Sequence, residues 1–261
     1  MSQDPGEAEP LAEGTLISHL LELRTRLLRS LLAAAIVFVP LAFFQNQLFT
    51  LVARPLLDKL PEGTSLIATS VVAPFMAPLK LSIVAALFIA MPFVLYQIWA
   101  FVAPGLYRHE RRFAMPLFLS SVVLFYVGVA FAYYVVFPLM FAFLTTTTPD
   151  GVQMMTDISS YLDFVLLLFF AFGVAFEVPV AVVLLASTGL VKVESLKKNR
   201  GYVLLGIFIV AAILTPPDAV SQSFMAIPMY VLYELGILFA QYLVRQRAAD
   251  KARHEAAQPG E

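Results

Sequence analysis

Cysteine is absent from this chain of 261 residues, and charged residues are scarce. Without cysteine the protein can hold no disulfide framework, iron–sulfur cluster or thiol nucleophile. Its three histidines are scattered, which excludes a zinc site of the usual kind. Only 13% of the residues are charged, and the net charge of −1 gives no bulk attraction to nucleic acid. We therefore expect no metal, no cofactor and no nucleic-acid partner.

Apolar residues make up 60% of the chain, against roughly 45–50% in soluble domains. A soluble core of this length cannot bury so much apolar surface. In lipid the backbone must satisfy its own hydrogen bonds, and the alternating pattern of a membrane barrel is absent. The composition predicts an all-α integral membrane protein.

Six apolar stretches are candidates for membrane-spanning helices, each of which needs roughly 20 apolar residues. They cover residues 27–44, 81–103, 113–144, 164–185, 202–214 and 224–244. The third is longer than a perpendicular span requires, and Pro138 favours a kink near its far end. The fifth is too short for a straight helix to cross an average bilayer. We expect a transmembrane domain over residues 18–247, between flexible tails at 1–17, which is acidic, and 248–261.

Lysine and arginine are divided unequally between the two sides of these six stretches. Of the 17 basic residues, all but Arg54, Lys59 and Lys80 lie on one side. Because cytoplasmic loops carry an excess of lysine and arginine, that side is predicted to be the cytoplasm. Both termini are then cytoplasmic.

The motifs of common enzymes are missing. His109-Glu110-Arg111 lacks the second histidine of a zinc-protease helix, and no glycine-rich phosphate loop is present. There is also no Gly-x-Ser-x-Gly nucleophile elbow. We expect a protein that is not an enzyme.

Two glutamates fall inside apolar stretches. Glu177 lies near the middle of the fourth stretch and Glu234 midway along the sixth. A carboxylate in hydrocarbon costs at least a few kcal/mol, so each must face a partner or water. Glu177 is either a packing device that hydrogen-bonds a neighbouring helix or a functional group. Gln222, Tyr133 and Tyr134 are candidate hydrogen-bond partners.

Other acidic residues lie among arginines on the predicted cytoplasmic side. Glu22 and Arg26 are four residues apart on an amphipathic helix, a spacing typical of a surface ion pair. Glu110 lies among three arginines and His109, a composition typical of a membrane-surface anchor. By spacing alone, these ordinary interpretations are favoured.

Four segments together resemble the TatC family, the large subunit of the twin-arginine translocase. They are residues 18–27 (SHLLELRTRL), residues 96–112 (YQIWAFVAPGLYRHERR), residues 172–179 (FGVAFEVP) and residues 214–218 (LTPPD). The similarity covers about residues 15 to 245 in matching order and spacing. It implies a glove-shaped bundle of six helices in the bacterial inner membrane, which receives folded cargo carrying an Arg-Arg signal peptide.

The resemblance also implies roles for particular residues. Glu22 and Glu110 are the acids of the two cytoplasmic motifs and would form the twin-arginine site, because paired guanidinium groups favour carboxylates. Arg24 and Phe101 match family positions tied to that site. Glu177 matches the intramembrane glutamate of the family, and with Gln222 it would accept a polar residue from a TatA or TatB helix.

The leading hypothesis is therefore a subunit that recognises twin-arginine signal peptides, assembles with TatA, TatB and further copies of itself, and exports folded proteins with the proton-motive force. One alternative is a proton-coupled secondary transporter of a small solute, in which Glu177 and Glu234 relay protons. It would need a midplane binding site and would act alone. A third possibility is a scaffold for other membrane subunits, which would not need Glu110.

Overall fold

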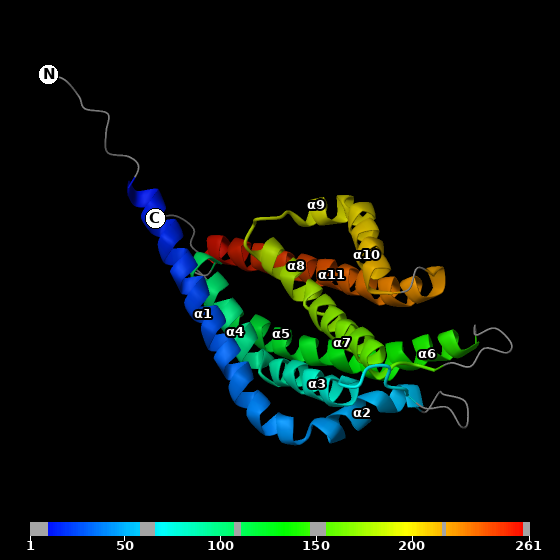
Figure 1. Cartoon of the computed structure of the whole chain (residues 1–261). Coiled ribbons are helices and arrows are strands. Elements are labelled where there is room, and N and C mark those ends of the chain that lie inside the picture. The colour runs from blue at the N-terminus through cyan, green and yellow to red at the C-terminus, as the bar shows by residue number, and fades with distance from the viewer. Residues whose placement is uncertain (1–9, 58–65, 107–110, 147–154, 216–217, 258–261) are drawn as a thin grey trace, which may run out of the picture. The chain divides into compact units, whose positions relative to one another are not determined.

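A computed structural model gives the fold of the protein (Figure 1). It describes all residues except 1–9, 58–65, 107–110, 147–154, 216–217 and 258–261. The described residues are helical apart from turns and one isolated β-bridge, between Ile67 and Asp157. The all-α class predicted from the composition is confirmed. The chain forms two compact units, residues 1–45 with 82–118 and residues 46–81 with 119–261.

In the first unit, α1 (Pro10–Phe43) packs against α4 (Met91–Leu106). α4 follows α3 (Ala73–Ile89), and the two helices are bent by 51° at Ala90. Pro92 explains this bend, because it has no N–H to donate to the carbonyl of Phe88, four residues earlier.

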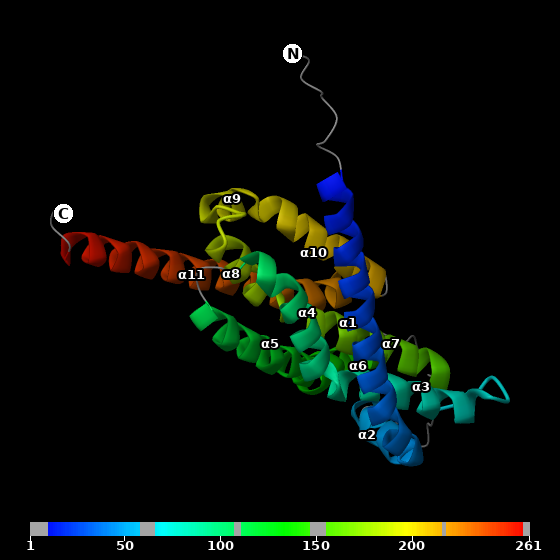
Figure 2. The same cartoon turned by 90° about the vertical axis from the view of Figure 1, so that its left-hand side faces the viewer.

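The second unit contains most of the remaining helices. They are α2 (Gln45–Leu57), most of α5 (Arg111–Phe131), the π-helical turn η1 (Ala132–Val136), α6 (Phe137–Thr146), α7 (Ile158–Ala175), α8 (Val178–Ser187), α9 (Val193–Lys198), α10 (Arg200–Leu214) and α11 (Ala219–Ala257). α8 and α10 both pack against α11, as the two views of the ribbon show (Figures 1 and 2). The core of this unit includes fully buried side chains such as Leu168, Phe172 and Ile237.

Two glycines allow α5 and α7 to approach each other closely. A Cβ added at Gly128 would lie 2.5 Å from the carbonyl oxygen of Phe172. A Cβ at Gly173 would lie 2.6 Å from the ring of Phe125. Small residues at such crossings let helix backbones pack together in a membrane, where apolar burial alone drives no association.

The π-helical turn η1 lies directly before Pro138, where the sequence favours a kink. In this turn the N–H of Phe137 donates to the carbonyl of Ala132, five residues earlier. Pro138 has no N–H for the carbonyl of Tyr134, so the regular α-helical pattern cannot continue unbroken through this point.

By length and composition, four described helical segments can cross a membrane: Ile17–Phe43, Met115–Phe143, Ile158–Ser187 and Ala219–Gln246. The bent pair α3 and α4 makes a fifth if it is one span. α10 corresponds to the short fifth stretch of the sequence, and its 15 residues reach only roughly 22 Å. It ends at Leu214, and the next residue, Thr215, is extended because a residue before proline avoids the helical conformation.

Candidate functional site

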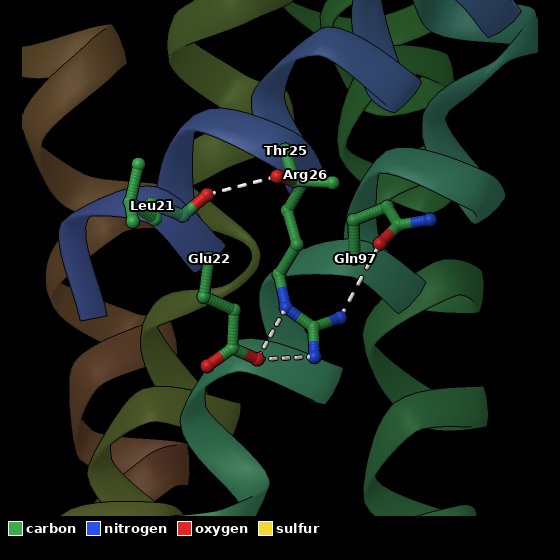
Figure 3. Close-up of polar contacts among 5 residues, drawn as sticks. All are labelled: Leu21, Glu22, Thr25, Arg26 and Gln97. Atoms are coloured by element: carbon green, nitrogen blue, oxygen red, sulfur yellow. Dashed lines mark hydrogen bonds and ion pairs between the residues drawn. The ribbon is translucent and has the colours of Figure 1, made fainter. Parts of the chain in front are cut away.

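Three side chains join α1 to α4 near the start of the first span. Arg26 donates to Oε1 of Glu22 from both Nε, at 2.9 Å, and Nη2, at 2.6 Å (Figure 3). Its Nη1 also donates to Oε1 of Gln97 on α4, at 3.3 Å. We call Glu22, Arg26 and Gln97 the α1–α4 polar cluster. The ion pair predicted from the spacing of Glu22 and Arg26 is confirmed, and Arg26 also links the two helices.

Only one of the two carboxylate oxygens of Glu22 accepts hydrogen bonds within this cluster. Both hydrogen bonds from Arg26 end on Oε1, and no described residue donates to Oε2. The Glu22 side chain is 40% exposed, whereas that of Arg26 is 20% exposed. An exposed carboxylate oxygen without a donor can form a charge-assisted hydrogen bond with a cationic ligand.

An aromatic contact lies on the same faces of the two helices. The rings of His19 and Phe101 stack with their centroids 4.3 Å apart and their planes 25° apart. His19 precedes Glu22 by three residues, and Phe101 follows Gln97 by four, so each pair shares one helix face. His19 and Phe101 thus lie on the helix faces that also carry Glu22 and Gln97.

The other two residues predicted for this site are placed differently. Arg24 is exposed and forms no ion pair with a described residue. It lies two residues from Glu22, a spacing at which side chains point to different faces of a helix. Glu110 lies outside the described residues.

Sequence reasoning missed Gln97, which is only 5% exposed and accepts the hydrogen bond from Arg26. A signal for it exists in the sequence, because it is the one amide side chain in the apolar stretch 81–103. Buried polar side chains need a hydrogen-bond partner, so an isolated glutamine in such a stretch predicts a polar contact with another helix.

Glu177 lies at a break between α7 and α8 and not inside a continuous helix. Its N–H donates to the carbonyl of Val174, three residues earlier. Pro179 occupies the first turn of α8 and offers no N–H to the carbonyl of Ala175. The break places the glutamate where the helical hydrogen-bond pattern changes.

The Glu177 carboxyl group contacts a neighbouring helix. Its Oε2 accepts a hydrogen bond from Oγ of Ser121 on α5, at 2.5 Å. Ser121 is 1% exposed. Oε1 of Glu177 is buried and has no hydrogen-bond partner among the described residues. This contact is the kind expected for an interhelical packing device, and it leaves one oxygen able to accept a further donor.

Gln222 and Glu234 each join α10 to α11. Gln222 Nε2 donates to the carbonyl of Phe208 at 2.8 Å, so the structure shows no hydrogen bond between Gln222 and Glu177. Glu234 pairs with Arg200 at 2.6 Å. The two intramembrane glutamates therefore have separate partners, Ser121 and Arg200.

The two tyrosines proposed as partners also lie elsewhere. Tyr133 donates to the carbonyl of Leu51 at 2.8 Å, and Tyr134 is 74% exposed. In the part of the chain that the structure describes, no group of three His, Cys, Asp or Glu residues could hold a metal ion.

The family model described as Sec-independent protein translocase protein (TatC) matches residues 18–228. The chain belongs to the TatC family. It is 55% identical over 244 residues to the TatC protein of Azotobacter chroococcum mcd 1, covering 94% of this chain and 95% of that protein. It is 54% identical over 229 residues to TatC of Escherichia coli, covering 88% and 89% of the two chains.

A solved structure shows the same fold. The crystal structure of the twin arginine translocase receptor TatC matches with a TM-score of 0.77 and 37% identity, over 86% of this chain and 98% of that chain. The chain thus has the six-span TatC fold and is a membrane-bound subunit of the Sec-independent protein translocase. As a component of that translocase, it works in a complex with other Tat subunits. Membership in a protein-translocase family contradicts the alternative of a secondary transporter for a small solute.

Proposed function

We propose that this subunit recognises the twin-arginine signal peptides of folded proteins with the surface formed by α1 and α4. The observation that carries the proposal is the half-exposed Glu22 side chain, whose Oε2 has no donor among the described residues. Glu22 lies on the face of α1 that also carries His19, whose ring stacks on Phe101 of α4. This surface belongs to the segment that matches the TatC family model.

The chemistry of the ligand fits this oxygen. A guanidinium group offers a planar array of donors that matches a carboxylate, whereas a lysine ammonium is a compact point charge. Two adjacent arginines need a second carboxylate, and we assign that role to Glu110 from the sequence motif that contains it. Phe101 would pack against the apolar part of the signal peptide, and Arg24 would organise the site without contacting the cationic ligand.

Export itself needs further subunits. We propose that TatA and TatB proteins and further copies of this chain complete the complex, in the bacterial inner membrane with both termini in the cytoplasm. The proton-motive force would supply the free energy. Binding and passage of cargo require no bond-breaking chemistry from this chain, which is consistent with a subunit that is not an enzyme and needs no cofactor.

Affinity measurements on the purified full chain test the recognition step. An Arg-Arg signal peptide should bind more tightly than its Lys-Lys counterpart. Glu22→Gln should weaken Arg-Arg binding by about tenfold or more, because hydrogen bonds to charged groups contribute about 1.5–3 kcal/mol. Asp163→Asn is the matched control, since Asp163 is also an exposed carboxylate in an ion pair, with Lys80. It should leave binding unchanged.

Arg26→Gln separates direct contact by Glu22 from an indirect effect. If Glu22 contacts the ligand, removing Arg26 frees Oε1 as well and should preserve or strengthen binding. Equal weakening in Glu22→Gln and Arg26→Gln would instead mean that the pair only positions α1 on α4. Equal affinity for the Arg-Arg and Lys-Lys peptides would contradict twin-arginine recognition.

We also propose that Glu177 docks a polar side chain from a TatA or TatB helix. Gln222 would contact such a helix at a separate point, because it precedes Gly236, which packs on Pro179, by roughly 21 Å of α11. The buried Oε1 of Glu177, which lacks a donor among the described residues, supports this role. A photoreactive residue in place of Val174, which is 48% exposed and one turn before Glu177, should crosslink to the small subunit. Glu177→Ala should reduce this crosslink, and an unchanged yield would contradict the proposal.

A further inference from the structure

A surface pocket of about 280 Å³ lies between the end of α8, α9 and the last turns of the span in α11. Its charged lining consists of Lys192, Lys197, Arg245 and Glu194. All four side chains are exposed. We call it the α8–α9–α11 pocket. Three cations and one carboxylate leave it with an excess of positive charge.

The three cations are not neutralised by ion pairs within the described residues. By contrast, Arg26 and Arg200 are each paired with a glutamate. Charges that share a concave surface add their potentials, so the pocket attracts an anion more strongly than a single exposed lysine does.

The pocket lies where two membrane-spanning segments end. The span Ile158–Ser187 stops just before it, and Arg245 is the penultimate residue of the span Ala219–Gln246. Gly189 turns the chain at this point, with φ of 75°, a conformation that glycine adopts without steric cost. The turn directs Val191 and Lys192 into the pocket lining. The ends of these two apolar segments predict that the cations lie near the membrane surface.

The surroundings of the cations are partly apolar. Val191, Val193 and Val244 contribute to the lining of the pocket. Val244 is 40% exposed, and Leu190, in the turn beside the pocket, is 72% exposed. A ligand that presents an anionic group next to hydrocarbon satisfies both parts of this surface, whereas a free phosphate ion satisfies only the cations.

We propose that the α8–α9–α11 pocket binds the anionic phosphodiester headgroup of a phospholipid. The phosphate interacts with Lys192, Lys197 and Arg245, and an acyl chain lies along the exposed apolar side chains. Basic pockets between transmembrane helices at the cytoplasmic face bind anionic headgroups by this chemistry. The distribution of lysine and arginine in the sequence predicts that this end of the helices faces the cytoplasm.

The test compares two double variants of the purified full chain that lose the same charge. Lys192→Gln/Arg245→Gln removes two pocket cations, and Lys198→Gln/Arg29→Gln removes two exposed cations that do not line it. Phosphatidylglycerol and phosphatidylcholine binding in detergent micelles is measured by native mass spectrometry, with thermal unfolding to verify folding. The affinity of the pocket variant for phosphatidylglycerol should fall by about tenfold, because each lysine or arginine near an anionic headgroup strengthens its binding. The affinity of the control variant should change little.

Glu194→Gln changes the pocket in the opposite direction. It removes the one carboxylate of the lining and should strengthen phosphatidylglycerol binding. Equal losses in the two double variants, or no loss in either, would overturn the proposal. Equal binding of phosphatidylcholine would also overturn it. Displacement of the lipid by glycerol phosphate at a comparable concentration would show that the pocket takes a soluble anion instead.

Discussion

In α1, the most apolar window of the span Ile17–Phe43 has only 6% of its residues buried within the protein. In the span Ile158–Ser187, formed by α7 and α8, the corresponding share is 61%. Both segments are long and apolar, so hydropathy alone does not separate them. The difference shows that α7 and α8 serve as the structural core of their unit, whereas α1 leaves most of its surface available to lipid, ligand or another subunit.

The largest expected effect comes from truncating one leucine in each region. Leu168 on α7 is 0% exposed, and Leu31 on α1 is 65% exposed. Leu168→Ala should reduce the free energy of unfolding by about 2–5 kcal/mol, because it leaves a cavity. Leu31→Ala should change it by no more than about 0.5 kcal/mol. Unfolding in detergent micelles by SDS titration measures both, and equal losses would contradict the comparison.

Glycine substitutions test the close packing of α5 on α7. Gly128→Ala should destabilise the protein by about 1–3 kcal/mol, since overpacking forces backbone shifts. The added Cβ meets a backbone oxygen and not a flexible side-chain end. Gly206→Ala on α10 is the control, because no atom lies within 4 Å of its added Cβ. Alanine has the higher helix propensity, so the control should be neutral or slightly stabilised. Equal destabilisation of the two variants would contradict the assignment of the loss to overpacking at Gly128.

A smaller effect is expected from the hydrogen bond between Ser121 and Glu177. Ser121→Ala should cost about 1 kcal/mol, the usual range for interhelical hydrogen bonds in membranes. Ser223→Ala serves as a control, since its hydroxyl donates within its own helix to the carbonyl of Ala219. Thermal unfolding of both variants in the same detergent measures the difference. Indistinguishable midpoints would mean that the contact with Glu177 adds nothing to helix packing.

The smallest effect is the pH dependence of stability that Asp157 contributes. Asp157 is the N-cap residue of α7, and its side chain accepts hydrogen bonds from the N–H groups of Ser159 and Ser160. Hydrogen bonds from the backbone of Ser160 and from Thr69 hold the pKa of Asp157 well below its usual value of 3.8. The folded pKa lies below the unfolded one, so the carboxylate stabilises the fold above about pH 4 and this contribution is lost as the pH falls further. Asp157→Asn should therefore show a smaller drop in unfolding temperature between pH 7 and pH 3 than the original chain. An equal drop in unfolding temperature would mean that the Asp157 carboxylate does not contribute to the pH dependence of stability.

Some features of the fold and of the site can be predicted from the sequence, and others depend on how the helices pack. The apolar stretches and the i, i+4 pair of Glu22 and Arg26 follow from local spacing, which a single helix determines. The role of Gln97 and the choice of Ser121 as the partner of Glu177 depend on which helices pack together. The break at Glu177 was not predicted, although Pro179 marks it in the sequence. The burial of α7 and the exposure of α1 could not be deduced either, because both segments have high mean hydropathy, 2.4 and 1.8.

The central claim is that the exposed start of α1 contacts the signal peptide. Photocrosslinking from position 20 tests it most directly, with position 31 as the control, because Leu20 and Leu31 on the same helix are 64% and 65% exposed. The measurement uses native membranes with an Arg-Arg signal peptide and its Lys-Lys counterpart. We predict a crosslink from position 20 that is lost with the Lys-Lys peptide and with Glu22→Gln. Equal crosslinking from both positions, or crosslinking indifferent to the arginines, would contradict the assignment of twin-arginine recognition to this surface.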